Sequence, residues 1–175
     1  MHTSPWAARA RYNQWMNERL YALAAQLTEA ERRKQRGAFF GSIHGTLAHI
    51  MVGDSVWMMR FNPGHESWRL TDSTGEPVTS YALDMDLWTD FDQLRAQRAR
   101  FDEGIIAWAT ATATDDPERP FVYHTMAGAR CEHPLWWAVD HFFNHQTHHR
   151  GQVTTLLMQA GLDPGVTDLI AFLRM

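Results

Sequence analysis

Hydrophobic residues recur every three or four positions in four long stretches of the chain, which is the period of an amphipathic helix. Ser4 followed by Pro5 is typical of a helix start. The third stretch is expected to begin at Thr89, with Asp92 completing the cap, and Gly161 closes the fourth. The pattern predicts helices over residues 5–27, 40–61, 89–112 and 134–160.

The segments between these helices predict the rest of the architecture. Thr28, with Glu31 three positions later, predicts a short capped helical turn. Residues 62–80 are rich in Gly, Pro, Ser and Thr and predict a long loop, whereas residues 119–132 predict a small β-hairpin. Residues 168–173 are apolar enough to dock back on the helices. The expected fold is all-α, a four-helix bundle with a small β-hairpin insertion before the last long helix.

Composition narrows the class of protein. The chain has 175 residues, 45% of them hydrophobic, which predicts one domain over residues 1–175 that buries its own core. Cys131 is the only cysteine, so a disulfide framework and a Cys-rich zinc site are excluded. A net charge of −4 argues against nucleic acid as a partner. Because no apolar run is long enough for a membrane span or a signal peptide, we expect no membrane contact and a cytoplasmic protein.

The last predicted helix carries an unusual group of histidines. Four of the ten histidines lie between positions 141 and 149. At 100° per residue, His145 and His149 lie one turn apart on the apolar, inward face, while His141 and His148 lie on its flank. Two imidazoles stacked inside an apolar face either chelate one metal ion or need separate hydrogen-bond partners.

Familiar metal motifs do not account for this pair. Gln146 stands where a zincin of the HExxH type carries its glutamate, and no Glu-x-x-His of the di-iron bundles is present. A third ligand must come from another helix, and His49 lies among small residues at the edge of the apolar arc of the second helix. A lone helical histidine is more often a hydrogen-bonded bystander. Asp54, within that arc, is either a buried structural acid or a partner that orients an imidazole.

Several segments together resemble the DinB-like family of four-helix metal proteins. The resemblance covers most of the chain, and the last of its segments is the most specific. The matching segments are residues 12–17 (YNQWMN), 42–50 (SIHGTLAHI) followed by Asp54 and Trp57, 125–128 (TMAG), and 143–152 (FNHQTHHRGQ).

This resemblance implies a bundle whose metal ligands are one histidine of the second helix, matching His49, and two of the last helix, matching His145 and His149. His44 and His148 are not ligand positions in the family's pattern. The better understood relatives are metal-dependent transferases or hydrolases that act through low-molecular-weight thiols. No motif in this chain identifies a thiol cosubstrate, and fold alone does not transfer an activity.

The leading hypothesis is a divalent zinc, nickel or iron ion that activates a low-molecular-weight thiol or water against a small electrophile. Candidates for proton transfer are His148, Asp54 and Tyr12, and Arg150 either attracts an anionic substrate or forms a surface ion pair. The catalytic residues themselves stay unknown, and so does whether the protein is an enzyme. The alternatives are a non-catalytic, stress-related module with a structural or sensing metal, and histidines that bind no metal and satisfy each other.

Aromatic residues suggest a subunit contact. The chain contains eight tryptophans and nine phenylalanines, more than one core readily hides. Trp136, Trp137 and Phe143 project away from the inward face of the last predicted helix. Exposed aromatic patches often mark protein interfaces, so we predict a homodimer.

Overall fold

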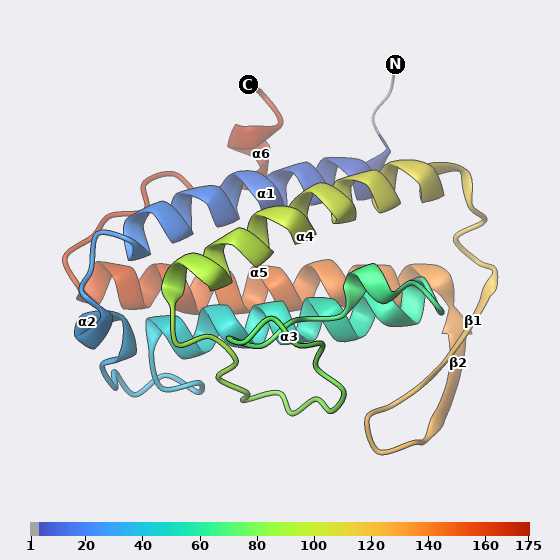
Figure 1. The fold of residues 1–175 in the computed structure, drawn as a ribbon. Helices are drawn as coiled ribbons and strands as arrows, with labels where there is room; N and C mark the ends of the chain where they lie inside the picture. The colour runs from blue at the N-terminus through green and yellow to red at the C-terminus, as the bar shows by residue number, and fades with distance from the viewer. Residues whose placement is uncertain (1–3) are drawn as a thin grey trace.

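The computed structural model describes residues 4–175 and is dominated by four long helices (Figure 1). These are α1 (Pro5–Ala24), α3 (Ile43–Phe61), α4 (Phe91–Ala111) and α5 (Leu135–Gln159). The shorter elements are α2 (Glu29–Arg33), the 3-10 turns η1 (Glu66–Trp68) and η2 (Thr112–Thr114), the strands β1 (Pro120–His124) and β2 (Arg130–Pro134), and α6 (Leu169–Phe172).

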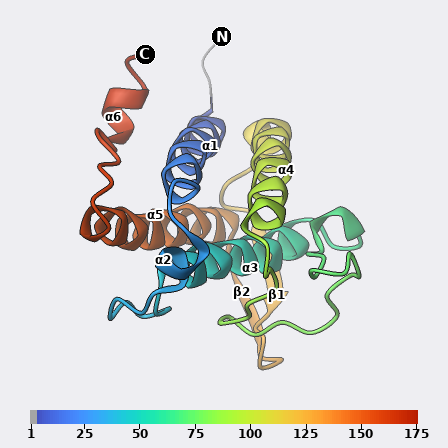
Figure 2. The same ribbon diagram turned by 60° about the vertical axis from the view of Figure 1, so that its left-hand side comes forward.

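The four long helices form two packed pairs. α1 lies along α4, and α3 lies antiparallel to α5, with α1 also contacting α5 (Figures 1 and 2). The core between the pairs contains fully buried side chains such as Leu20, Met51, Phe101 and Phe142. The predicted fold class is confirmed: the chain is an all-α bundle with a small hairpin before its last long helix.

Side-chain caps decide where the helices begin. Ser4 accepts a hydrogen bond from the backbone of Ala7, and Thr28 caps the short α2, both as predicted. Ser42 caps α3, so this helix starts at Ile43 and not at residue 40. The cap of α4 is Asp90, whose side chain accepts from the backbone N–H of Asp92. The predicted start near Thr89 therefore lies one position before the observed cap.

The long connection between α3 and α4 is anchored along its length. It runs over α3 (Figure 1), and it buries Leu70, Val78 and Trp88 against the bundle. The hydroxyl of Ser55 on α3 donates to the carbonyl oxygen of Trp68 at 2.6 Å. The backbone N–H of Leu70 donates to the hydroxyl of Tyr81 at 3.1 Å. The loop is thus a fixed part of the fold that covers one side of α3.

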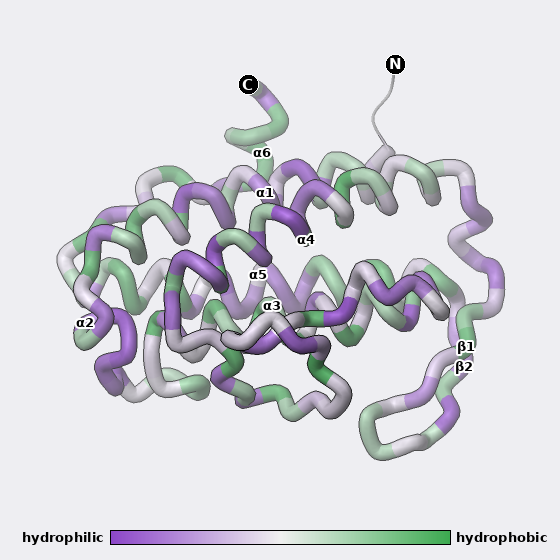
Figure 3. The backbone as a smooth tube through the Cα atoms, viewed as in Figure 1, coloured by the Kyte–Doolittle hydropathy of each residue, from purple (hydrophilic) through white to green (hydrophobic). Residues whose placement is uncertain are grey.

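The hairpin and the C-terminal segment both pack where the sequence predicts. β1 and β2 pair antiparallel, and Gly128 turns the chain with a φ of 85°. The ring of Phe172 in α6 lies 5.9 Å from that of Tyr12 and 5.5 Å from that of Trp15. Figure 3 shows the segment around α6 as mainly hydrophobic, which fits its docking on α1.

The aromatic residues of α5 follow the prediction in part. Trp136 and Trp137 are exposed, at 38% and 53%. Phe143 was expected to face outward but is buried, because α1 covers that flank of α5. A homodimer stays a prediction. Among residues 4–175, no helix has the length and apolarity that a bilayer crossing requires.

Candidate metal centre

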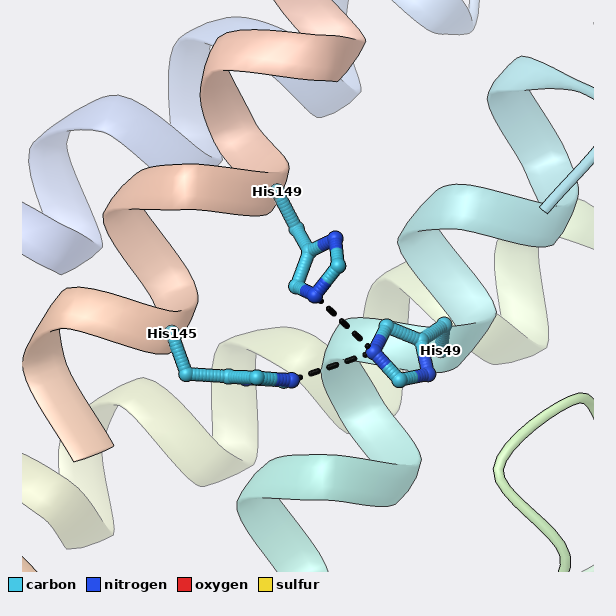
Figure 4. A group of neighbouring side chains, drawn as sticks. All are labelled: His49, His145 and His149. Atoms are coloured by element: carbon cyan, nitrogen blue, oxygen red, sulfur yellow. Dashed lines mark hydrogen bonds between the residues drawn. The ribbon is translucent and has the colours of Figure 1, made fainter. Parts of the chain in front are cut away.

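Three imidazoles from two helices converge between α3 and α5 (Figure 4). The Nε2 atom of His49 on α3 lies 3.0 Å from Nε2 of His145 and 3.1 Å from Nε2 of His149, both on α5. One ligand atom from each of the three residues lies within 4.8 Å of the other two. Two nitrogens bound at 2.0–2.1 Å and a tetrahedral angle lie about 3.3 Å apart. The structure therefore brings the three sequence-predicted ligands together at a spacing that one cation can bridge.

The outer nitrogens of two imidazoles are already used. Nδ1 of His49 donates to the carbonyl oxygen of Leu83 at 2.8 Å, and Nδ1 of His149 donates to Oε1 of Gln152 at 2.9 Å. In a neutral imidazole this leaves the Nε2 atom unprotonated, with a free lone pair. The Nε2 lone pairs of His49 and His149 then face each other with no proton between them. Hydrogen bonding within the trio cannot satisfy both, whereas a cation at their meeting point satisfies all three.

Two glycines of α3 make room for this arrangement. A Cβ atom at Gly53 would lie 2.7 Å from Cε1 of His145, and a Cβ atom at Gly45 would lie 2.3 Å from the carbonyl oxygen of Phe40. The loop before α3 can therefore pass close to its first turn. The ring of Phe40 stacks on that of His49, with 3.6 Å between centroids and 16° between planes. Small residues thus let both α5 and this loop reach the imidazole of His49.

Burial keeps the imidazoles neutral. Loss of solvent lowers the pKa of His49 to about 4, although the hydrogen bond to Leu83 opposes the shift. Burial, followed by the neighbouring histidines, lowers the pKa of His145 to about 3. Burial also lowers the pKa of His149, against the effect of its hydrogen bond to Gln152. At neutral pH all three are therefore in the form that binds a metal ion.

Comparison with known proteins assigns the chain to a family. The model of the DinB family matches residues 2–175. The chain belongs to the DinB family. It is also 21% identical over 166 residues to Protein DinB of Bacillus subtilis (strain 168), a match that covers 94% of this chain and 91% of that protein. The region matched to the DinB family includes all of α3 and α5, and so contains the three converging imidazoles.

Three further histidines of this DinB-family chain, His44, His141 and His148, lie outside the trio. His44 is held by Arg33 and Asp86, whose nearest atoms lie 3.2 Å and 3.1 Å from its Nε2 atom. His141 is exposed, with its ring 6.1 Å from that of His145. His148 is exposed beside the centre, and its Nε2 atom lies 3.2 Å from the amide nitrogen of Gln152. The family pattern, which excludes His44 and His148 as ligands, agrees with this arrangement.

Asp54 matches the structural alternative. Its side chain is fully buried and accepts hydrogen bonds from Nη1 of Arg98 at 2.6 Å and from Nε2 of Gln146 at 2.8 Å. Arg98 also pairs with Asp102. Asp54 therefore belongs to a charged network in the bundle core, and within residues 4–175 it orients no imidazole. This placement argues against its role as a proton-transfer group at the centre.

Tyr12 and Arg150 lie elsewhere. The hydroxyl of Tyr12 donates to the carbonyl oxygen of Thr167 at 2.5 Å, on the side of α1 that faces the C-terminal segment. Arg150 was expected either to attract an anionic substrate or to form a surface ion pair, and the surface ion pair was wrong because the residue is buried. It is 2% exposed and donates to the side chains of Asn13 and Thr147. The flank of α5 that carries it is covered by α1.

Three further residues shape the centre and were missed in the sequence. Gln152 lies three positions after His149, a spacing that places both on one helix face and that could have been noticed. Phe40 stacks on His49 from a loop predicted as helix. Leu83 contacts His49 through its backbone carbonyl, which every residue type has, so the sequence could not indicate this contact.

Proposed function

We propose that His49, His145 and His149 bind a divalent metal ion, and that the protein is a metal-dependent enzyme acting on a small electrophile with a low-molecular-weight thiol or water. One observation carries this proposal. Nε2 of His49 lies within 3.1 Å of both other Nε2 atoms, while the Nδ1 atoms of His49 and His149 are engaged by Leu83 and Gln152. The lone pairs of His49 and His149 therefore converge, and one proton on Nε2 of His145 cannot satisfy both.

The chemistry of the donor set supports an open, reactive ion. Three neutral imidazoles leave the charge of a divalent cation uncompensated and occupy three positions, as in catalytic rather than closed structural sites. Zinc, nickel and iron all accept imidazole ligands. When bound, such an ion supplies a Lewis acid that lowers the pKa of water or a thiol toward neutrality.

The surrounding residues position the ligands and limit the approach of water. The carbonyl of Leu83 and the amide of Gln152 hold two imidazole rings in fixed tautomers. The ring of Phe40 covers one face of His49. Of the three candidates for proton transfer, only His148 adjoins the centre, with its ring 4.8 Å from that of His149. His148 is therefore the side chain of this set that we propose for proton transfer.

A non-catalytic role is the second candidate. It is favoured by the fact that the three ligands come from two different helices. His49 comes from α3, whereas His145 and His149 come from α5. A bound ion would link the two helices and stabilise the folded state by mass action. In that case the ion serves structure or sensing, and no turnover accompanies its binding.

Metal titration followed by turnover assays separates these functions. Metal-free protein is titrated with Zn²⁺, Ni²⁺ or Fe²⁺, and one equivalent should bind to the natural chain and none to His49→Ala. His44→Ala serves as the control, because His44 lies on the same helix but outside the trio. The metal-loaded protein is then assayed for thiol transfer with a panel of cellular thiols and small electrophiles. It is also assayed for hydrolysis of ester and amide substrates, in which water is the nucleophile.

The two readouts give distinct outcomes. Turnover that requires the ion and disappears in His49→Ala supports the enzyme. Binding of one equivalent that raises the melting temperature without turnover supports the structural or sensing role. Absence of binding in the natural chain contradicts both roles, and leaves the alternative in which the histidines bind no metal ion.

A further inference from the structure

A groove lies between α1 and α5, next to the C-terminal segment. This groove has a volume of about 720 Å³ and is bounded by α1, α5 and residues 167–169. Asn144, Thr147 and Gly151 line it from α5. At 100° per residue they lie about 140–160° around the helix from His149. None of the three converging histidines lines the groove, and its volume is in the range of small-molecule sites.

A buried cation without an anionic partner lines this groove. Arg150 is 2% exposed, and its guanidinium donates only to neutral oxygens, Oδ1 of Asn13 and Oγ1 of Thr147. Within residues 4–175 it forms no ion pair. The buried acids that act on it from a distance, Asp54 and Asp102, both pair with Arg98.

Asn13 provides a second unused donor at the same place. It is 1% exposed and also lines the groove. Its Oδ1 atom accepts from Arg150, which fixes the orientation of the amide. Its Nδ2 atom has no hydrogen-bond partner among the described residues. A guanidinium beside an amide N–H₂ matches the two oxygens of a carboxylate.

The rest of the groove suits an uncharged, partly apolar body. Tyr12 contributes an aromatic wall, with its ring centre 5.3 Å from the guanidinium carbon of Arg150. A Cβ atom at Gly151 would have no neighbour within 4 Å, so this position opens into free space. The rim carries Asp168, together with Asp140 paired to Arg9. Positive charge is therefore at the buried end of the groove, and Asp168 at the rim disfavours a second negative charge on the ligand.

We propose that this groove binds a small organic monocarboxylate, with its carboxylate on Arg150 and Asn13 and its apolar body along Tyr12. The site is distinct from the metal centre because none of the three converging histidines lines it. It needs neither a bound ion nor turnover.

Binding of phenylacetate and of its neutral isostere phenylacetamide to metal-free protein tests the proposal. Calorimetry or NMR titration should give saturable binding of phenylacetate with a Kd of about 1 mM or below, a value reasonable for a ligand of about ten non-hydrogen atoms. Phenylacetamide should bind at least about tenfold more weakly, because it cannot offer two anionic oxygens to Arg150.

Variants locate the ligand. Gly151→Leu fills the groove without touching the core network, and should weaken phenylacetate binding at least about tenfold. Gly151→Ala adds one methyl group in open space and should bind within about twofold of the natural chain. Arg150→Gln should also lose binding, and Gly151→Leu carries the test if that variant fails to fold. In His49→Ala, which removes a proposed metal ligand, phenylacetate binding should persist.

Several results would overturn the proposal. They are the absence of saturable phenylacetate binding, equal binding of the amide, full binding by Gly151→Leu, or binding that needs a metal ion and disappears in His49→Ala. The last result would place the carboxylate on the metal. Since metal binding is measured separately, failure of the groove leaves the proposed function standing, and failure of the metal centre leaves the groove.

Discussion

Two buried polar clusters share the helices α3 and α5 and differ in how their groups are satisfied. In the core cluster, Arg98 lies between Asp54 and Asp102, so opposite charges meet. In the histidine cluster, groups of one kind point their lone pairs at a common position. Opposite charges that pair within the protein have a structural role. Imidazole nitrogens whose lone pairs converge without a partner indicate a site for a bound ion.

The two clusters also occupy adjacent positions in the sequence. Gly53 makes room for the imidazole of His145, whereas the next residue, Asp54, accepts from Arg98. On α5, His145 belongs to the trio, whereas Gln146 donates to Asp54. Because successive residues of a helix point about 100° apart, neighbouring positions serve different clusters. Substitutions one residue apart should therefore separate stability from metal affinity.

The largest effect is expected in the core cluster. Arg98→Met leaves Asp54 and Asp102 buried without their cation and should lower the free energy of unfolding by about 3–5 kcal/mol. Urea denaturation of metal-free protein measures this. Arg95→Met is the matched control, since Arg95 is exposed on the same helix, and should change stability by about 0.5 kcal/mol or less. Equal stability of the two variants would show that the core pairs contribute nothing.

The opposite pattern is expected in the histidine cluster. His145→Ala should lower metal affinity by more than about 100-fold, because loss of a ligand exceeds the loss of a group that merely orients one. Its metal-free stability should change by about 1 kcal/mol or less. Calorimetric metal titration and urea denaturation give the two values. His148→Ala changes an exposed neighbour and should keep full metal affinity. A comparable loss of affinity in His148→Ala would contradict the assignment of His145 as a ligand.

A smaller and more selective effect is expected at the contact between the helices. Gly53→Ala places a methyl group against the ring of His145 and should lower metal affinity about 10–100-fold. Alanine is more favourable than glycine within a helix by about 1 kcal/mol. This gain offsets the packing strain, so the stability of the metal-free protein should change little. Gly151→Ala offers the same gain in open space and should leave affinity unchanged. Unchanged affinity in Gly53→Ala would mean that the ring of His145 moves freely.

The smallest effect concerns pH and lies outside both clusters. Burial and the charge of Arg33 lower the pKa of His44 below 6.5, although Asp86 opposes the shift. Below pH 6.5 the unfolded chain therefore binds a proton that the folded chain does not, and stability falls as the pH falls. Between pH 7.5 and 5.5, the natural chain should lose up to about 1 kcal/mol more than His44→Gln in urea denaturation. Parallel curves would contradict this assignment.

The sequence predicted local features well, because periodicity and caps are local. The helices, the hairpin and the stacking of His145 over His149 follow from spacing within a few residues. The small neighbours of His49 made it only a weak candidate, which the family resemblance strengthened, since nothing local shows which distant helix faces α5. The pairing of Asp54 with Arg98, 44 residues apart, has no local signal either.

The errors on α5 share one physical cause. A helical projection assumes a single inward face, centred here on His149. α5 instead contacts α3 on one side and α1 on another, so Phe143 and Arg150 are buried on a flank that the projection places outside. A helix with two neighbours has two buried sides.

The contact between His49 and Leu83 carries a consequence for how this protein can vary. Every amino acid offers a main-chain carbonyl, so residue 83 can change identity while the imidazole keeps its orientation. Insertions or deletions in the connection between α3 and α4 would displace that oxygen. Constraint at this position therefore acts on loop length and path, and relatives could align poorly here while retaining the same geometry.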